Sequence, residues 1–290
     1  MNKKDTTVLG IFGNISKPEV SGLLFNLIKF LEKIKTEFLI DRSLLKILKA
    51  DQSRHAATVN QILQNADFIV SLGGDGTFLN TARLVGDKNI PILGINLGRL
   101  GFYSEISPDE YTDFIPKLLK GKFKITEQVV LKSVYKNKVH FGLNDIVVDK
   151  SDSIRMVETE TYYEDEKVFR CISDGIIVST PAGSTGYSLS CNGPIVNPDS
   201  NVFVITPISP HTFNVRPIIV PDTGNIRILL PNRGIARITA DGQRSAKIIT
   251  PSELTVSKAN FRIKVIKKQN YSYFHTLKKK LYWNVDKRYS

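Results

Sequence analysis

A glycine-rich segment, Gly73-Gly74-Asp75-Gly76-Thr77, carries the residue types of a phosphate-binding turn. It follows an apolar run at Phe68–Leu72 and precedes residues at helical spacing, so it predicts a buried strand, a tight turn and a helix start. Glycines let backbone N–H groups approach a ligand closely, and a helix N-terminus favours negative charge. The segment lacks the Gly-Lys-Ser/Thr of a Walker A loop and the GxGxxG spacing of dinucleotide-binding folds.

Asp75 is the candidate reactive group of this turn. A carboxylate beside bound phosphates is repelled by them unless it binds a metal or takes a proton from a reacting group. Phosphoryl transfer uses both of these roles. The residues alone leave a second interpretation open, in which the segment is an ordinary turn and Asp75 caps the following helix.

Further candidate binding groups lie in the second half of the chain. From Asp174 to Asn192, prolines and glycines alternate with hydroxyl residues, a composition that suits ribose or phosphate, and Tyr187 could offer a ring to a base. Asn144-Asp145 could bind ribose hydroxyls or an adenine edge, although Asn-Asp is also a common turn element. Asp241-Gly242-Gln243 predicts a hairpin turn first and a ligand loop second.

Two kinds of element must position these groups. Up to about residue 120, apolar strands alternate with helical segments, which predicts a Rossmann-like parallel sheet covered by helices. From Gly121, short alternating runs separated by turn residues predict a β-rich, sandwich-like domain. We therefore expect an α/β domain over 1–123, a β-rich domain over 124–260 and a tail over 261–290. The amphipathic segment Phe274–Leu281 of that tail is expected to dock back on the N-terminal domain.

Composition narrows the class of protein. Hydrophobic residues make up 41% and charged residues 23%, as in ordinary globular proteins, and no apolar run predicts a membrane span or a signal segment. Cys171 and Cys191 are isolated and lack metal-ligand spacing, so we expect reduced thiols in a cytoplasmic protein. The net charge of +12 suggests anionic partners. Because the basic residues are scattered and no nucleic-acid module accompanies them, a nucleotide is favoured over a nucleic acid.

Taken together, these motifs resemble the NAD kinase family. The glycine-rich turn GGDGT alone also occurs in diacylglycerol, sphingosine and 6-phosphofructokinase relatives, so it marks only a superfamily. The long hydroxyl-rich segment and its companions are what favour the NAD kinases. The matching segments are GGDGT (73–77), GRLGF (98–102), LND (143–145), the hydroxyl-rich segment (174–196), ISPHTFNVRPIIV (208–220), DGQ (241–243) and YFHTLKKKLYW (273–283).

The resemblance implies that ATP phosphorylates the adenosine 2′-hydroxyl of NAD⁺ to give NADP⁺, with a divalent metal, Mg²⁺ or Mn²⁺. It implies that Asp75 is the general base and that the protein is a homo-oligomer, a dimer or a tetramer. It also implies that nucleotide is bound by Gly74, Gly76 and Thr77 (phosphates), Phe102 (adenine), Asn144 and Asp145 (adenosine half), Asp174 (nicotinamide half), Thr185, Gly186 and Tyr187 (adenosine pocket), and Gln243.

The chain departs from the family pattern at three positions. Asn144-Asp145 replaces the usual Asn-Glu, Ala182 stands where Ser or Thr is common, and Gly186 stands where Ala is common. These departures bear on nucleotide affinity and on the choice between NAD⁺ and NADH. Two other functions stay open from the sequence: a lipid or other small-alcohol kinase of the same superfamily, and a non-catalytic dinucleotide sensor. The polar segment 179–190 argues against the first, and the intact Asp75 argues against the second.

Overall fold

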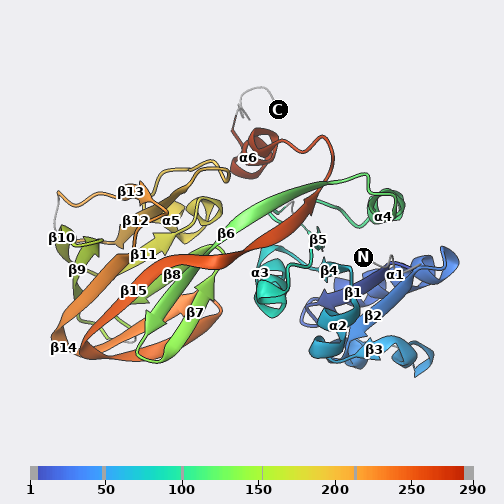
Figure 1. The fold of residues 1–290 in the computed structure, drawn as a ribbon, viewed down its shortest axis with the longest axis horizontal. Helices are drawn as coiled ribbons and strands as arrows, with labels where there is room; N and C mark the ends of the chain where they lie inside the picture. The colour runs from blue at the N-terminus through green and yellow to red at the C-terminus, as the bar shows by residue number, and fades with distance from the viewer. Residues whose placement is uncertain (1–5, 48–49, 99–100, 152, 212–213, 284–290) are drawn as a thin grey trace. The chain divides into compact units, whose positions relative to one another are not determined.

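The structure is a computed structural model that describes residues 6–47, 50–98, 101–151, 153–211 and 214–283 (Figure 1). The chain divides into two compact units, one formed by Met1–Glu127 with Ile263–Ser290 and the other by Gln128–Arg262. The chain passes from one unit to the other along strand β6 (Lys124–Tyr135) and returns along strand β15 (Arg244–Lys267). No helix in the described part of the chain is long and apolar enough to cross a membrane.

The first unit is built on a parallel sheet with the strand order β15-β5-β4-β1-β2-β3. Its own strands are β1 (Val8–Gly13), β2 (Glu37–Asp41), β3 (Ala56–Ala57), β4 (Phe68–Leu72) and β5 (Ile92–Ile95). The connecting helices are α1 (Glu19–Lys33), α2 (Val59–Asn65), α3 (Asp75–Val85) and α4 (Tyr111–Leu119), with short 3₁₀ turns η1 (Arg42–Ile47), η2 (Ala50–His55) and η3 (Gly86–Lys88) (Figure 1).

Helices cover both faces of this sheet because strand side chains alternate in direction. Ile11 of β1 belongs to a buried hydrophobic core that includes α1 and α4. The neighbouring Gly10 faces α2, where a β-carbon would clash with the side chain of Ile62, so the close approach of the helix requires glycine. On β4, the buried hydroxyl of Ser71 is 2.9 Å from that of Thr81 in α3. The predicted parallel sheet with helices on both faces is therefore confirmed.

The second unit is antiparallel, with the strand order β13-β12-β11-β8-β14-β15. Strand β14 pairs with β9 over Ile226–Leu229 and with β8 over Arg237–Ala240, on either side of a register shift. By changing partner, β14 contributes to both layers around one hydrophobic core, as in a sandwich. The strands are β7 (Lys138–Gly142), β8 (Asp145–Asp149), β9 (Val157–Tyr163), β10 (Glu166–Ser173), β11 (Gly175–Ser179), β12 (Val202–Ile208), β13 (Ile218–Pro221) and β14 (Ile226–Ala240).

The tail forms the predicted amphipathic helix, α6 (Tyr273–Leu281), which belongs to the first unit. Its N-cap is Ser272, whose hydroxyl accepts from the backbone N–H of His275 at 3.3 Å. Thr276 and Leu277 are its buried residues. This helix places three consecutive lysines, 278–280, in its last turn, where positive charge complements the helix dipole.

Candidate active site

Asp75 is held by three consecutive backbone amides. Its carboxylate accepts from Phe102 N at 2.9 Å, from Tyr103 N at 3.1 Å and from Ser104 N at 3.4 Å. The N-cap of α3 is Gly74, and no side chain caps that helix. The interpretation of Asp75 as a helix cap is therefore wrong. Its carboxylate instead joins the loops that follow β4 and β5, at the carboxyl ends of parallel strands, where open α/β sheets bind ligands.

Glycine is required where the loop approaches this carboxylate. A β-carbon on Gly101 would clash with Oδ1 of Asp75, and one on Gly73, whose φ is +154°, would clash with the side chain of Thr77. Both glycines therefore allow close packing that a larger residue would prevent. The other two positions of the segment GRLGF, Arg99 and Leu100, lie outside the described residues.

Two lysines with accessible ammonium groups approach the turn from distant elements. Lys280 of α6 forms an ion pair with Asp75 Oδ2 at 3.3 Å, and its Nζ lies 5.0 Å from the ring centroid of Phe102. Lys17, which follows β1, places its Nζ 3.6 Å from the position that a β-carbon on Gly74 would occupy. The turn therefore lies in a positively charged environment that suits phosphate oxygens.

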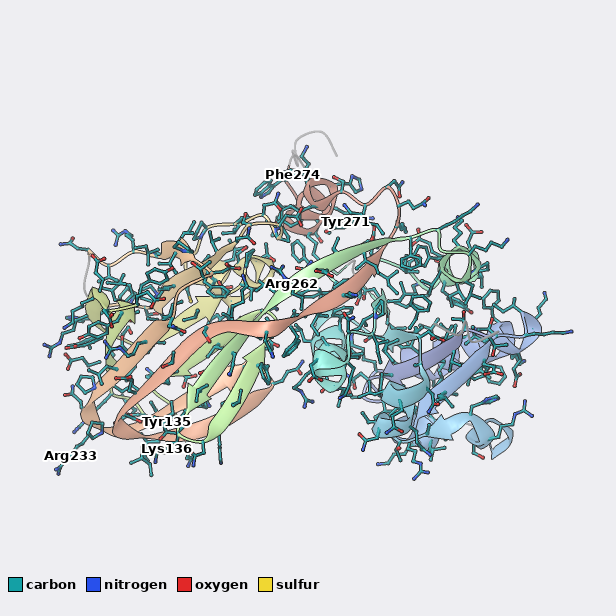
Figure 2. All side chains as sticks on the ribbon, viewed as in Figure 1. Tyr135, Lys136, Arg233, Arg262, Tyr271 and Phe274 are labelled. Atoms are coloured by element: carbon teal, nitrogen blue, oxygen red, sulfur yellow. The ribbon has the colours of Figure 1, made fainter. Side chains whose placement is uncertain are left out.

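A third lysine, Lys267 at the end of β15, is buried beneath the same loop and is only 3% exposed. Its ammonium donates to the carbonyl oxygen of Phe102 at 2.6 Å and lies 4.6 Å from the ring centroid of Tyr271, which Figure 2 labels. Burial lowers the pKa of Lys267 to about 8, while the nearby Glu105 and Asp75 carboxylates act in the opposite direction. Lys267 thus holds the carbonyl side of the loop whose amides hold Asp75.

In the second unit, the backbone around Asn144 and Asp145 is held by Asp241. The Asp241 carboxylate accepts from Leu143 N at 2.9 Å, from Asn144 N at 2.7 Å and from Asp145 N at 3.2 Å. Asp241 and Gly242 have φ values of 52° and 64°, the positive pair typical of a tight hairpin turn between β14 and β15. The predicted hairpin turn is confirmed, and its first residue organises the LND segment.

Asp145 itself is 5% exposed. Burial, with a further contribution from the negative charge of Asp241, raises the pKa of Asp145 to about 7. It lies in a pocket of about 550 Å³ within the second unit, where Arg237 and Asp149 form an ion pair at 3.1 Å. Four of the predicted binding residues line this pocket, namely Asn144, Asp145, Tyr187 and Gln243, together with Val147, Asp149, Arg237, Thr239, Asp241, Gly242 and Ser245.

Three predicted binding residues of this unit, Gly186, Thr185 and Asp174, do not line that pocket. A β-carbon on Gly186 would lie 3.8 Å from Asn144 Nδ2 and 3.9 Å from Asp145 Oδ2, so Gly186 adjoins the pocket residues. Thr185 donates its hydroxyl to the carbonyl oxygen of Ala182 at 3.2 Å. Asp174 is not among the pocket residues and forms an ion pair with Lys150 at 2.8 Å.

The hydroxyl-rich segment is more helical than its sequence suggests, with a 3₁₀ turn η4 (Ala182–Thr185) and a single helical turn α5 (Tyr187–Ser190). Its buried hydroxyls build this structure. Thr180 donates to the carbonyl oxygen of Leu143 at 2.7 Å, and Ser184 donates to that of Pro181 at 2.6 Å. The hydroxyls of these residues therefore fix the backbone near the pocket. Elements this short contain too few turns for periodicity to reveal them.

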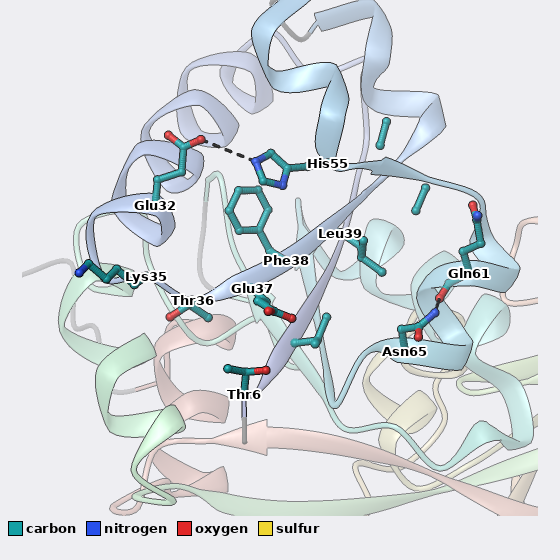
Figure 3. A pocket seen from close by; sticks show the side chains of 13 residues that line it. Thr6, Glu32, Lys35, Thr36, Glu37, Phe38, Leu39, His55, Gln61 and Asn65 are labelled. Atoms are coloured by element: carbon teal, nitrogen blue, oxygen red, sulfur yellow. Dashed lines mark hydrogen bonds and ion pairs between the residues drawn. The ribbon is translucent and has the colours of Figure 1, made fainter. Parts of the chain in front are cut away.

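A larger hollow of about 830 Å³ in the first unit is a different feature (Figure 3). Its lining includes Val8 and Glu37, the first residues of β1 and β2, so it lies beside the amino ends of parallel strands. The imidazole of His55 stacks on Phe38 at a centroid distance of 4.1 Å and lies 3.6 Å from Glu32 Oε1. Because open α/β sheets bind ligands at the carboxyl ends of their strands, the glycine-rich turn is the better candidate site.

Three functional candidates of this turn were not singled out from the sequence: Lys17, Lys267 and Lys280. Lys280 lies within the family-matching segment 273–283, which was the available signal, but its run of lysines is typical of a solvated surface. Lys17 has no motif around it. The one available signal for Lys267 is its place at the end of a β-rich run, where a charged residue would be expected to face solvent.

The turn, its lysines and the nucleotide-sized pocket define the class of a nucleotide-dependent phosphotransferase. Comparison with known proteins makes this specific. Residues 9–123 match the family model of the ATP-NAD kinase N-terminal domain, and residues 143–268 match that of the ATP-NAD kinase C-terminal domain. The chain belongs to the NAD kinase family, which confirms the family and the fold class expected from its motifs.

Relatives cover almost the whole chain. The NAD kinase of Cytophaga hutchinsonii is 36% identical over 290 residues, which is 97% of this chain and 99% of the relative. The NAD kinase of Bacteroides fragilis is 37% identical over 285 residues, which is 96% and 98% of the two chains.

Two solved structures share the fold. The crystal structure of yeast NADH kinase complexed with NADH superposes with a TM-score of 0.87 at 23% identity and covers 97% of this chain and 89% of that one. An NAD kinase from Archaeoglobus fulgidus in complex with ATP superposes with a TM-score of 0.77 at 25% identity and covers 94% and 99%.

Proposed function

We propose that this chain transfers the γ-phosphoryl group of ATP to the adenosine 2′-hydroxyl of NAD⁺, with Asp75 as the general base. The observation that carries this proposal is the fixed carboxylate of Asp75, which lies in the glycine-rich turn after a parallel strand and is held by three amides. A carboxylate within hydrogen-bond reach of a hydroxyl can accept its proton while the oxygen attacks phosphorus. The ADP leaving group departs with the electron pair of the broken bond.

The other predicted residues receive binding roles that follow from their chemistry. In the first unit, Gly74, Gly76 and Thr77 hold phosphate oxygens at the start of α3, and the ring of Phe102 packs on adenine. In the second unit, Asn144 and Asp145 bind ribose hydroxyls, and Asp174 meets the nicotinamide half. The walls of the adenosine pocket are then formed by Thr185, Gly186, Tyr187 and Gln243. The pocket of about 550 Å³ that four of these residues line supports this assignment.

A divalent metal, Mg²⁺ or Mn²⁺, belongs to the proposal as a companion of ATP. Among the described residues, no group of three His, Cys, Asp or Glu side chains is placed to hold a metal ion. Mg²⁺ is commonly bound by one or two carboxylates together with substrate phosphates, so this chain fits a metal that arrives on the nucleotide. When bound, the metal would neutralise charge on the phosphate oxygens.

We propose a homo-oligomer, a dimer or a tetramer, which size-exclusion chromatography with light scattering would test. Two free cysteines, Cys171 and Cys191, support a reducing cytoplasmic location. The domain-model matches support an N-terminal domain ending near residue 123, and the grouping of 263–290 with the first unit supports the docked tail.

A coupled assay tests the reaction. Purified protein, ATP, Mg²⁺ and NAD⁺ are incubated, and NADP⁺ is read with an NADP-specific dehydrogenase. We expect NADP⁺ from the wild type and a fall in kcat of about 10²–10⁴-fold in Asp75→Asn, the usual contribution of a general base. Asp87→Asn, a change at a surface aspartate of the same unit, should keep the wild-type rate.

Three outcomes would contradict the proposal in different ways. If Asp75→Asn stays folded and keeps more than a tenth of the wild-type kcat, Asp75 is not the base. If the wild type forms no NADP⁺ but binds NAD⁺ in calorimetry, the chain is a dinucleotide sensor. If it forms no NADP⁺ and does not bind NAD⁺, a lipid or other small-alcohol acceptor must be sought, although the charged lining of the second-unit pocket disfavours that function.

A further inference from the structure

The proposed mechanism gives no role to Lys280, which lies beside Asp75. Its ammonium lies 3.3 Å from Oδ2 of Asp75, the oxygen that also accepts from Phe102 N, and 5.0 Å from the centroid of the Phe102 ring. Its side chain is 25% exposed, so solvent-borne ligands can reach it. A group that hydrogen-bonds to Asp75 would therefore come within a few ångströms of this ammonium.

Other residues of the tail besides Lys280 are buried or paired. Thr276 and Leu277 are the buried residues of the helix, and Ser272 caps its N-terminus. Just before the helix, Lys268 forms an ion pair with Glu110 at 2.7 Å. The Lys268–Glu110 pair joins the tail to the first unit without Lys280, so the Lys280 side chain can take another role.

The charges near the turn also favour an anion. Lys17, Lys267 and Lys280 bring three ammonium groups to the loops around Gly74 and Phe102, whereas the carboxylates placed near them are Asp75 and Glu105. Of the three ammonium groups, that of Lys267 is buried on the Phe102 carbonyl. Among these three described lysines, Lys17 and Lys280 are the ones that a phosphate could reach.

We propose that Lys280 is a catalytic cation of the phosphoryl-transfer step. During that step its ammonium group moves from Asp75 to the phosphoryl group that is being transferred. This inference rests on the proposed function. In the step, the 2′-oxygen of NAD⁺ forms a bond to the γ-phosphorus, the bond from that phosphorus to the ADP oxygen breaks, and ADP takes the electron pair. The hydroxyl proton goes to Asp75. When the Lys280 side chain moves, its ammonium group binds the phosphoryl oxygens and stabilises their negative charge. Asp75 Oδ2 then loses its ion pair and can accept the hydroxyl proton.

Three variants test this role, each measured for kcat, KM for ATP, KM for NAD⁺ and thermal unfolding. Lys280→Met should lower kcat by about 10²–10³-fold, the cost of losing one oxyanion-stabilising group. The KM for NAD⁺ should change less than about threefold. Lys280→Arg should recover at least a tenfold part of the loss, because a guanidinium also binds phosphate. Lys279→Met removes the same charge from an exposed neighbouring position and should behave as the wild type.

Two results would overturn the inference. One is a Lys280→Met protein whose kcat at saturating ATP lies within about twofold of the Lys279→Met protein. The other is a loss of kcat that Lys280→Arg does not relieve and that a lowered unfolding temperature accompanies, since that pattern indicates a structural tether. Failure of the proposed function itself is distinguishable, because in that case the wild type forms no NADP⁺.

Discussion

In each of the two units, three consecutive backbone amides bind one carboxylate, but the charges around the two carboxylates differ. In the first, three consecutive amides, 102–104, bind the carboxylate of Asp75, and in the second, three consecutive amides, 143–145, bind that of Asp241. The surroundings differ, because Lys280 pairs with Asp75 whereas Asp145 lies close enough to Asp241 for their charges to oppose each other. The first arrangement suits anionic phosphates and the second suits hydroxyl groups.

The difference also separates the two carboxylates by role. Asp241 accepts from the backbone amides of Asn144 and Asp145, so its role is to position these residues. Asp75 is itself the group we propose to react. A cradle of amides therefore does not by itself mark a catalytic carboxylate, and the neighbouring charges must be considered with it.

The largest fall in kcat is expected at Gly101, where there is no room for a side chain beside the Asp75 carboxylate. Gly101→Ala places a β-carbon against Oδ1 of Asp75, so the carboxylate must move away from its amides. We expect a fall in kcat of about a thousandfold, similar to removal of the base itself. Gly22→Ala, at a helical glycine with open space around it, is the control and should keep full activity. A Gly101→Ala protein with near wild-type turnover would show that the Asp75 cradle is not needed.

A smaller effect should follow from the burial of Asp145 beside Asp241 in the second unit. The pKa of Asp145 is about 7 in the folded protein against an unperturbed 3.8, so the folded state binds more protons between these values and its stability falls as pH rises towards 7. Asp145→Asn should therefore unfold with a free energy about 4 kcal/mol higher than the wild type at pH 8, and about 2 kcal/mol higher at pH 5. Urea unfolding at both pH values measures this difference.

Asp165→Asn changes an exposed aspartate of the same unit and should show no such dependence on pH. If Asp145→Asn is equally stable relative to the wild type at pH 5 and pH 8, burial and the charge of Asp241 do not raise the pKa of Asp145 in the folded protein. The nucleotide affinity of the variant is a separate readout, because the amide also replaces a proposed ribose ligand.

The smallest effect concerns Lys267 and has the opposite sign. Its pKa is about 8 when folded and 10.5 when unperturbed, so the unfolded state binds more protons between these values and stability rises with pH over that interval. The wild type should gain about 2 kcal/mol of unfolding free energy between pH 7 and pH 10 relative to Lys267→Met. Lys279→Met is the matched control, because it removes a lysine from an exposed position. If the wild type gains the same unfolding free energy with pH relative to Lys279→Met, Lys267 is not the source of the pH dependence.

Local sequence patterns predicted most of the framework. The apolar run at Phe68–Leu72 became β4, the turn after it became the start of α3, and the segment Phe274–Leu281 lies within α6. The alternating runs of the second half became the antiparallel strands. These elements depend on neighbouring residues, so periodicity and turn chemistry are sufficient to place them.

The contacts that shape the sites were not predictable in the same way. Asp75 meets a loop 27 residues further on and a lysine 205 residues further on, and Asp241 supports a segment nearly 100 residues before it. Such pairings are fixed by the order of strands in a sheet, which short patterns do not encode. The buried hydroxyl of Thr180 is a similar case, since its type suggested a ligand group and the fold used it as an internal bond.

The discontinuity of the first unit has a consequence for the growing chain. Residues 263–281 complete that unit but are synthesised after all of the second unit, and a polypeptide leaves the ribosome from its N-terminal end. While the second unit is emerging, the loop at Phe102 has neither Lys267 beneath it nor Lys280 beside it. Of the three lysines near the turn, the nascent first unit therefore has only Lys17 until the second unit has been made.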